Sequence, residues 1–337
     1  MTLAFSLFAR RLGSMFVTAL CLSVVVFIVL RMIPSDPLAM LLPPSATQAD
    51  IDAVRIELGL NGTIFEQYMV WLGRALQGDL GSSIYFREPV TALLATTLPA
   101  TLELVLVSLA IALLISIPGG ILLYKLEGRK GEMGADFFLV VLLSIPSFLW
   151  GIILIIVFGV MFPILPFMGR VDPSFAVPSI TGFMLVDALL QGDLRALVDA
   201  FSHLILPALA LALSFSPIIV RVLRSSLLET ATEQYVMTAR LRGQSEWNVL
   251  LRHMLKNAAL PTLTLIGVQF GFLFGGTLLI ELIFSFPGIG NLMVQAIKNF
   301  DLPLIQGVAL VFCLMVLLIN FCVDSLYVVL NPRVKTS

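Results

Sequence analysis

The sequence predicts an all-α integral membrane protein with six transmembrane helices and an extracytoplasmic segment between the first two. Three observations support this fold class: an apolar composition, a series of charge-free windows, and basic residues that gather in alternate loops. The chain is 59% hydrophobic and 12% charged, with a mean hydropathy of +1.03. Soluble domains have about 45–50% apolar and about 25% charged residues. Lipid therefore replaces water around most of this chain.

Apolar windows define the expected spans, because a bilayer-crossing helix needs about 20 mostly apolar residues. Five windows cover residues 12–30, 104–124, 137–169, 258–280 and 302–323. A sixth, 204–220, is shorter and carries Pro207 and Pro217, which membrane helices tolerate where neighbours satisfy the freed carbonyls. The first window exceeds the ~7–15 residues of a signal-peptide core, so we expect it to remain as a helix.

The basic residues predict the orientation, since loops rich in Lys and Arg stay in the cytoplasm. With the N-terminus inside, thirteen of the 20 basic residues are cytoplasmic: Arg10, Arg11, Lys125, Arg129, Lys130, Arg221, Arg224, Arg240, Arg242, Arg252, Lys256, Arg333 and Lys335. Most acidic residues of the loops fall on the other side. Both termini are therefore expected in the cytoplasm.

These spans divide the chain into an N-terminal transmembrane helix (1–33), an outer segment (34–97), a five-helix core (98–330) and a cytoplasmic tail (331–337). The outer segment contains two amphipathic stretches. One follows a capping-box pattern at Thr47 and Asp50, and the other covers residues 65–76. We expect an ordered cap. A second outer segment, 166–202, is less regular and is expected to cover the mouth of the molecule.

Motifs for chemistry are absent from the sequence. It has no G-x-x-x-x-G-K-[ST] phosphate loop, no H-E-x-x-H and no G-x-S-x-G, and its two histidines are His203 and His253. We therefore expect no catalytic residue, no metal site and no cofactor on this chain. The net charge of −1 and the lack of a basic tract also argue against nucleic acid as a partner.

Charged residues inside the spans are candidates for function, because a charge within the bilayer is costly. Arg31, Glu103 and Glu281 all fall near the outer ends of their helices. Two interpretations remain open for them. They form a structural ion cluster in the outer leaflet, or Glu103 and Glu281 line the translocation path at its mouth.

Three glycines, Gly267, Gly271 and Gly275, recur every four residues in the fifth span. Small residues at this spacing let helix backbones approach closely. The glycines are expected either to pack against a helix of the same chain or to lie at a subunit interface beside a conduit.

The loop at 225–260, between the fourth and fifth spans, is expected to form a helix, a turn at Gly243 and a second helix. Trp247, Leu250, Leu251 and Met254 share one face of the second helix. Such a compact unit on the basic side of the membrane suits a cytoplasmic protein partner. The alternative is an amphipathic hairpin that lies on the membrane surface.

This loop resembles the coupling loop of bacterial ABC importer permeases of the dipeptide/oligopeptide (and nickel) family. The pattern Y-V-x-T-A-R-x-x-G matches Tyr235 to Gly243, and H-x-x-x-N-A-x-x-P matches His253 to Pro261. Leu241-Arg242 stands where the family commonly has Ala-Lys. The resemblance implies that an ATPase is contacted through Glu233, Tyr235, Thr238, Ala239, Arg240, Arg242, Gly243, His253, Asn257 and Pro261.

Other segments in family order support the same resemblance. They are Arg10-Arg11-Leu12, Pro34-Ser35-Asp36-Pro37, Gly78 to Ser83, Thr101 to Leu104, His203 to Pro207, Phe284 to Gly290, Asp324 to Tyr327 and Asn331 to Arg333. The stretch from Thr181 to Ala188 is most similar to the first permease subunit of dipeptide transporters.

The resemblance implies the type I permease fold and an ATP-driven importer that moves dipeptides or short peptides across the bacterial inner membrane by alternating access. It also implies a heterodimer with a second homologous permease subunit, a periplasmic substrate-binding protein, surrounding membrane lipid, and two cytoplasmic ABC ATPases that carry ATP and Mg²⁺. Nickel, glutathione or antimicrobial peptides are alternative cargoes. An ion-coupled secondary transporter or channel is the alternative of another class, but the mid-membrane charge relays or paired broken helices typical of it are not found in the sequence.

Overall fold

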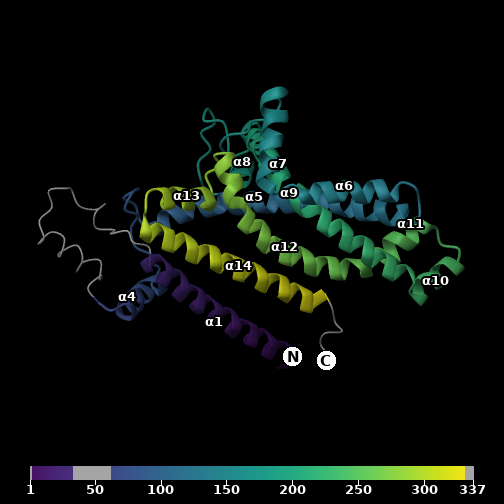
Figure 1. Cartoon of the computed structure of the whole chain (residues 1–337), viewed down its shortest axis with the longest axis horizontal. Helices are drawn as coiled ribbons and strands as arrows, with labels where there is room; N and C mark the ends of the chain where they lie inside the picture. Colours follow the sequence, from purple (N-terminus) through teal and green to yellow (C-terminus); the bar gives the residue numbers. More distant parts are fainter. Residues whose placement is uncertain (1, 33–61, 331–337) are drawn as a thin grey trace, which may run out of the picture.

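The computed structural model describes residues 2–32 and 62–330, and every extended element in this part of the chain is a helix. Five long helices run along the bundle in Figure 1: α1 (Thr2–Met32), α5 (Val90–Leu126), α9 (Leu194–Ala231), α12 (Leu255–Ile283) and α14 (Leu302–Leu330). The amphipathic stretch expected after Thr47 and the tail at 331–337 lie outside the described residues. The second stretch is confirmed as α4 (Ile64–Leu76).

The third span is a broken helix. α6 (Glu132–Ser144) is followed by α7 (Ser147–Leu154) and the π-helical η1 (Ile155–Met161), and the two parts are bent by 96°. Pro146 explains the break, since a residue before proline avoids the helical region and Ile145 is extended. The described residues thus hold five uninterrupted spans, and six if the bent pair counts as one. The prediction of one continuous span over 137–169 is wrong.

Two helices extend well beyond their predicted windows. α5 begins at Val90, inside the predicted outer segment, and α9 covers 38 residues instead of the 17 of its window. The windows stopped at Glu103 and Arg221, whereas the helices continue past both; Glu103 pairs with Arg170, and Arg221 is exposed. Asp193 starts α9 by accepting the backbone N–H groups of Arg195 and Ala196.

Helix α9 forms the centre of the bundle, where it contacts α5, α12, α7 and α6. Ala208 and Ala212 lie on one face and Ala210 on the opposite face, and all three are fully buried. Lipid is as apolar as leucine, so close packing of small side chains stabilises such contacts more than removal from water does. α1 lies outermost against α14, and only 11% of its apolar window is buried (Figure 1).

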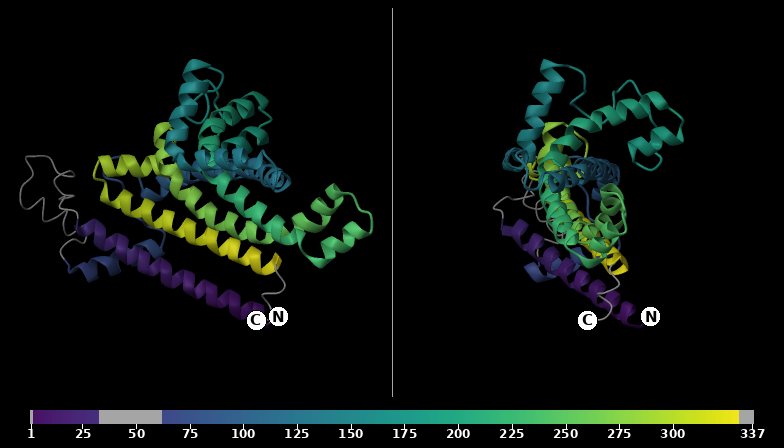
Figure 2. Two further views of the ribbon diagram at one scale, coloured as in Figure 1. Left: turned by 45° about the vertical axis from the view of Figure 1, so that its right-hand side comes forward. Right: turned by 90° about the vertical axis from the view of Figure 1, so that its right-hand side faces the viewer.

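The two ends of the bundle carry different elements. One end, called here the α10 end, holds α10 (Gln234–Leu241), α11 (Glu246–Asn248) and the π-helical η2 (Val249–Met254). The Thr2 end of α1 and the Leu330 end of α14 point the same way (Figure 1). The opposite end holds α13 (Ile289–Lys298) and the start of α5. α7 and α8 (Met184–Leu190) project from the bundle, as both views in Figure 2 show.

Candidate coupling surface and polar clamps

The segment from α10 to η2 forms a helical hairpin that closes at Gly243. α10 begins after Glu233, whose backbone is extended, and Gly243 follows its C-terminus with φ of +73°. The N–H of Gly243 donates to the carbonyl of Arg240 at 2.9 Å, and that of Gln244 to the carbonyl of Ala239 at 3.3 Å. This pair of bonds is a Schellman motif, which requires the left-handed residue that glycine supplies. The predicted order of helix, glycine and helix is confirmed.

Side-chain hydrogen bonds tie the two arms of the hairpin together. The Asn257 Nδ2 group donates to the Tyr235 hydroxyl at 2.7 Å, and His253 Nε2 lies 2.9 Å from the Gln244 side-chain oxygen. The spacing of these residues in the sequence therefore has a structural explanation: residues 22 positions apart meet in space. Tyr235, His253 and Asn257 fix the shape of the hairpin.

The remaining candidate residues of the loop are mostly exposed. Arg240 pairs with Glu246 on the second arm, with Nε 3.1 Å from Oε1. Thr238 bonds within its own helix, Arg242 is exposed at the end of α10, and Pro261 is exposed in the second turn of α12. These groups form the outside of the hairpin.

The inner face of the hairpin differs from the predicted one. Leu250 and Met254 are buried as expected, but Trp247 and Leu251 are about half exposed. η2 explains the difference, because a π-helix has more residues per turn than an α-helix and rotates the following side chains. Ala239 is also buried, in a cluster with these two buried residues. It packs inside the hairpin and is not on its surface.

An apolar surface remains on the outside of the hairpin. We call it the hairpin surface, and it consists of Met237, Leu241, Trp247 and Leu251. Leu241 is the most exposed of the four, at 83%. The ammonium group of Lys125 lies 3.4 Å from the centre of the Trp247 ring, a cation–π contact that holds the ring toward the end of α5. Exposed apolar side chains grouped at one end of a bundle are typical of a contact site for a partner.

Arg224 anchors α9 at the same end through three carboxylates. Its guanidinium donates to Asp136 at 3.0 Å and to Glu127 at 2.5 Å, and it also contacts Glu132. Glu127 follows α5, whereas Glu132 and Asp136 belong to α6. The sequence contained no sign of this cluster beyond the charges themselves, because its members come from segments about 90 residues apart.

Glu103 links α5 to the segment that precedes α8. One carboxylate oxygen accepts from Arg170 Nε at 3.1 Å and Nη2 at 2.6 Å, and the other accepts the N–H of Leu185 at 2.7 Å. Arg170 also donates to the carbonyl of Gly182. The Glu103 carboxylate is thus fully satisfied although only 4% of the residue is exposed.

Asp187 organises the loop that Glu103 holds. Its oxygens accept the N–H groups of Ile180, Thr181 and Gly182 and the Thr181 hydroxyl, at 2.7–3.2 Å. Burial raises the pKa of the Asp187 carboxyl, but these hydrogen bonds outweigh it and leave the pKa below its ordinary value. Gly182 is left-handed, at φ of +82°, and packs against Pro99. The stretch from Thr181 to Ala188 is therefore a folded unit with its own polar centre.

Glu281 holds α13 onto the bundle. Its carboxylate accepts the Thr101 hydroxyl at 2.6 Å and the N–H of Asn291 at 3.1 Å, and the residue is fully buried. A side chain at Gly288 or Gly290 would collide with this carboxylate. The glycines of the Phe284–Gly290 segment are therefore required for the N-terminus of α13 to approach this carboxyl group, which accepts one of its free N–H groups.

The three charged residues from the spans do not form one cluster. Glu103 pairs with Arg170, Glu281 accepts hydrogen bonds from neutral groups, and the Arg31 guanidinium lies 5.2 Å from the centre of the Phe27 ring. The ion-cluster interpretation is wrong. Both acidic residues are fully engaged in joining helices, and whether either lines a path stays a prediction.

The glycines of α12 separate into two roles. A Cβ on Gly267 would collide with Val323 of α14, and one on Gly271 would lie 3.5 Å from Asn320. These two allow close packing within the chain. Gly275 is exposed, and nothing lies within 4 Å of its Cβ position. Gly275 is the member of this series that remains open to a second subunit.

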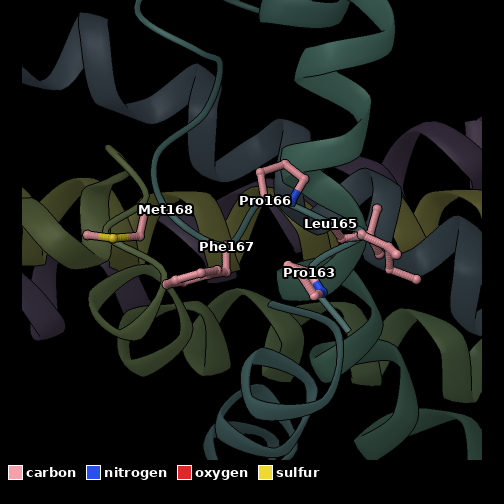
Figure 3. A pocket seen from close by; sticks show the side chains of 6 residues that line it. Pro163, Leu165, Pro166, Phe167 and Met168 are labelled. Atoms are coloured by element: carbon pink, nitrogen blue, oxygen red, sulfur yellow. The ribbon is translucent and has the colours of Figure 1, made fainter. Parts of the chain in front are cut away.

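Figure 3 shows an open hollow along the loop after η1, lined by Pro163, Ile164, Leu165, Pro166, Phe167 and Met168. The Phe167 ring packs back against Gly159. All six lining residues are apolar and consecutive in the chain. The hollow offers no charged group to a polar ligand.

Asp301 is a structural position that the sequence did not reveal. It is fully buried, it accepts the Ser83 hydroxyl at 2.5 Å and the N–H of Tyr85 at 3.1 Å, and its second oxygen caps α14 through Leu304. The Gly78–Ser83 segment thus docks on the start of α14. This role of Asp301 could not be predicted from the sequence, because its partner Ser83 is 218 residues away.

The chain belongs to the family of binding-protein-dependent transport system inner membrane components. That family matches residues 116–336, and the N-terminal component of the same systems matches residues 4–105. The class is thus a multi-pass permease of the inner membrane, and both the predicted family and the predicted fold class are confirmed.

Full-length relatives narrow the comparison. The di/tripeptide transport system permease protein DppB of Pseudomonas aeruginosa is 38% identical over 331 residues, which cover 98% of each chain. The dipeptide permease DppB of Escherichia coli K12 is 37% identical, and the glutathione permease GsiC of Escherichia coli O6:H1 is 33% identical, each over 97% of both chains. A solved chain of the MetNI methionine ABC transporter, in inward facing conformations, matches with a TM-score of 0.55 at 18% identity. It covers 71% of this chain and 96% of its own, and it supports the fold.

Proposed function

We propose that this chain is one permease subunit of an ATP-driven importer that moves dipeptides and short peptides into the cytoplasm by alternating access. The observation that carries the proposal is the similarity, over 97–98% of both chains, to permeases named for dipeptide and di/tripeptide transport. The absence of a phosphate loop in the sequence agrees with a subunit that contributes the path and leaves ATP hydrolysis to other chains.

The proposed assembly has a second homologous permease subunit, two cytoplasmic ABC ATPases that bind ATP and Mg²⁺, and a periplasmic substrate-binding protein. No cofactor is assigned to this chain. The hairpin surface is the proposed contact for an ATPase, because it presents four apolar side chains on a unit that internal hydrogen bonds hold rigid. Gly275 and the exposed apolar face around it are proposed to meet the second permease subunit.

Rigidity of the hairpin is what the proposed mechanism requires. Closure of two ATPases around ATP moves whatever is docked on them, and a soft loop would absorb that movement. Here, Ala239 and Met254 pack the hairpin onto Leu227 near the end of α9. Movement of the hairpin is therefore passed to α9, the central helix, and shifts the population between inward-open and outward-open states.

The proposed orientation places the α10 end and both termini in the cytoplasm. With the native cysteines replaced, we expect Leu189→Cys, at a position of α8 that is 62% exposed, to react with an impermeant thiol reagent in intact spheroplasts. Arg129→Cys, in the exposed turn between α5 and α6, should react only after permeabilisation. The basic residues near that turn motivate the expectation. Labelling of Arg129→Cys from outside would contradict the orientation.

The function itself is tested by purifying the solubilised chain with its bound partners and identifying them by mass spectrometry. We expect an external binding protein and ABC ATPases among them. The reconstituted assembly should take up dipeptides in an ATP-dependent manner, whereas this chain alone should neither bind nor hydrolyse ATP. Saturable ATP turnover by the isolated chain, or an assembly without any ATPase, would refute the proposal.

The same assembly also decides between cargoes. Glutathione is a specific alternative, because a permease named for glutathione transport is 33% identical over nearly the whole chain. Uptake of dipeptides, longer peptides, glutathione and nickel should be compared at equal protein. A clear preference for glutathione or nickel would agree with the importer function but would replace dipeptides as the proposed cargo.

A further inference from the structure

Helix α4 is too short to cross a membrane and too apolar for a water-facing cap. Its 13 residues extend about 20 Å, whereas a bilayer core is about 30 Å thick. The helix begins with a capping box between Thr63 and Glu66, with the Thr63 N–H donating to the Glu66 carboxylate at 2.7 Å. α4 is thus a well-defined helix, and its surroundings need an explanation.

α4 lies against a part of α1 that is inside the membrane. The Tyr68 hydroxyl is 2.8 Å from the Ser23 hydroxyl, and the Tyr68 and Trp71 rings pack on Phe27 with centroids 5.4 and 5.9 Å away. Ser23 precedes Arg31 by eight residues, which is about 12 Å along the helix. Arg31 is the first charged residue after the apolar window of α1. These contacts place α4 beside the last turns of a membrane span.

The side of α4 that turns away from α1 is divided into an apolar and a polar part. Phe65, Met69 and Leu76 follow one another at helical spacing and are 71%, 51% and 75% exposed. Glu66 and Arg74 lie about 80° and 160° around the helix from this row and are also exposed, and Val70, which is 52% exposed, lies between them. The exposed residues Val25 and Val29 belong to the same span of α1, on the side opposite the α4 contact.

We propose that α4 is embedded in the lipid leaflet at the Met32 end of α1, with Phe65, Met69 and Leu76 among the acyl chains and Glu66 and Arg74 at the headgroups. The observation that selects lipid as the occupant is depth: α4 packs on Ser23 and Phe27, which lie inside the apolar window of α1, so the exposed apolar side chains of α4 lie at the level of the span. A helix with one polar and one strongly apolar side, set 5–10 Å below the headgroups, has the form of an interfacial helix. This inference does not depend on the cargo.

The experiment places a fluorophore on each side of α4. The native cysteines Cys21, Cys313 and Cys322 are first replaced by serine. Phe65→Cys and Met69→Cys are then compared with the matched controls Glu66→Cys and Arg74→Cys on the same helix, and with Val25→Cys on α1. Each variant is labelled with bimane in nanodiscs that keep the native assembly and lipids. Quenching is measured with doxyl groups on lipid chains and with iodide in water.

We expect bimane at Phe65→Cys and Met69→Cys to be quenched by doxyl lipid as strongly as at Val25→Cys, and to be protected from iodide. The label at Glu66→Cys and Arg74→Cys should show the reverse, with severalfold stronger quenching by iodide. If iodide quenches Phe65→Cys and Met69→Cys as strongly as the controls, the face is in water and the proposal is overturned. If neither quencher reaches these positions, a protein covers the face, which equally overturns it.

Discussion

Leu241→Asp is expected to leave the chain folded in the membrane while it removes most of the co-purifying ATPase and most of the uptake. Leu241 is 83% exposed, so the stability of the folded chain changes little when this side chain is replaced. In the proposed contact, a carboxylate buried without a partner costs about 1–3 kcal/mol. Each 1.4 kcal/mol is about tenfold in affinity. The measurements are membrane abundance, ATPase bound per chain and ATP-dependent uptake.

Two matched controls separate contact from strain. Met133→Asp changes an apolar residue of similar exposure (81%) at the start of α6, outside the hairpin. Gly243→Asp and Gly128→Asp introduce the same side chain at two left-handed glycines, φ +73° and +70°, with open space around both. The two substitutions cause the same backbone strain. A difference in ATPase binding between them therefore shows whether residue 243 lies at the contact. If Leu241→Asp transports like the unchanged protein at equal abundance, the hairpin surface is not the ATPase contact.

Ala239→Asp is expected to act differently from Leu241→Asp. Because Ala239 is 4% exposed inside the hairpin, a carboxylate there disturbs the cluster with Leu250 and Met254 before any partner binds. Loss of ATPase binding in this variant would therefore not identify a contact surface. Substitutions at exposed positions such as Leu241 are the ones that can identify the contact surface.

Glu281→Ala is expected to cause a large loss of stability. It leaves the Thr101 hydroxyl and the Asn291 N–H without their acceptor and removes the carboxyl group against which α13 begins. An unsatisfied buried group costs about 1–3 kcal/mol, so the two together amount to roughly 2–6 kcal/mol. Thermal unfolding of the purified chain, followed by the loss of its monomeric chromatographic peak, measures the effect.

Glu281→Gln retains an acceptor oxygen and should lose clearly less stability than Glu281→Ala. Glu88→Ala, at an exposed position near the start of α5, should unfold like the unchanged protein. Equal unfolding temperatures for Glu281→Ala and Glu88→Ala would show that the Glu281 hydrogen bonds do not hold α13 in place.

The sequence was sufficient for features that depend on neighbouring residues. Apolar windows located the spans, and the glycine at 243 marked the turn of the hairpin because a left-handed residue is needed there. The break at Pro146 was missed, because the apolar window continues across it, and its 96° angle depends on how α6 and α7 pack on α9. The length of α9 was underestimated because Arg221 and Arg224 ended its window.

Features that depend on distant residues could not be derived. Glu103 and Glu281 were recognised as costly charges, but their partners Arg170 and Thr101 lie 67 and 180 residues away. The same holds for Asp301. The exposed side of the hairpin was also assigned incorrectly, because periodicity assumes α-helical geometry and η2 departs from it. Local pattern defines which residues are unusual, and tertiary packing defines what they touch.

The length and burial of α9 make it a lever. Its 38 residues extend about 57 Å, from the loop beside α8 at one end to the hairpin at the other. A helix packed on several sides turns as a rod more easily than it bends, and a tilt of about 5° around its middle moves each end by about 2.5 Å in opposite directions. Pro207 and Pro217 lie near that middle, where each removes a backbone hydrogen bond, so α9 bends there more easily than elsewhere. A push on the hairpin would therefore arrive at the Asp193 end reversed in direction and reduced by the bending at these two prolines.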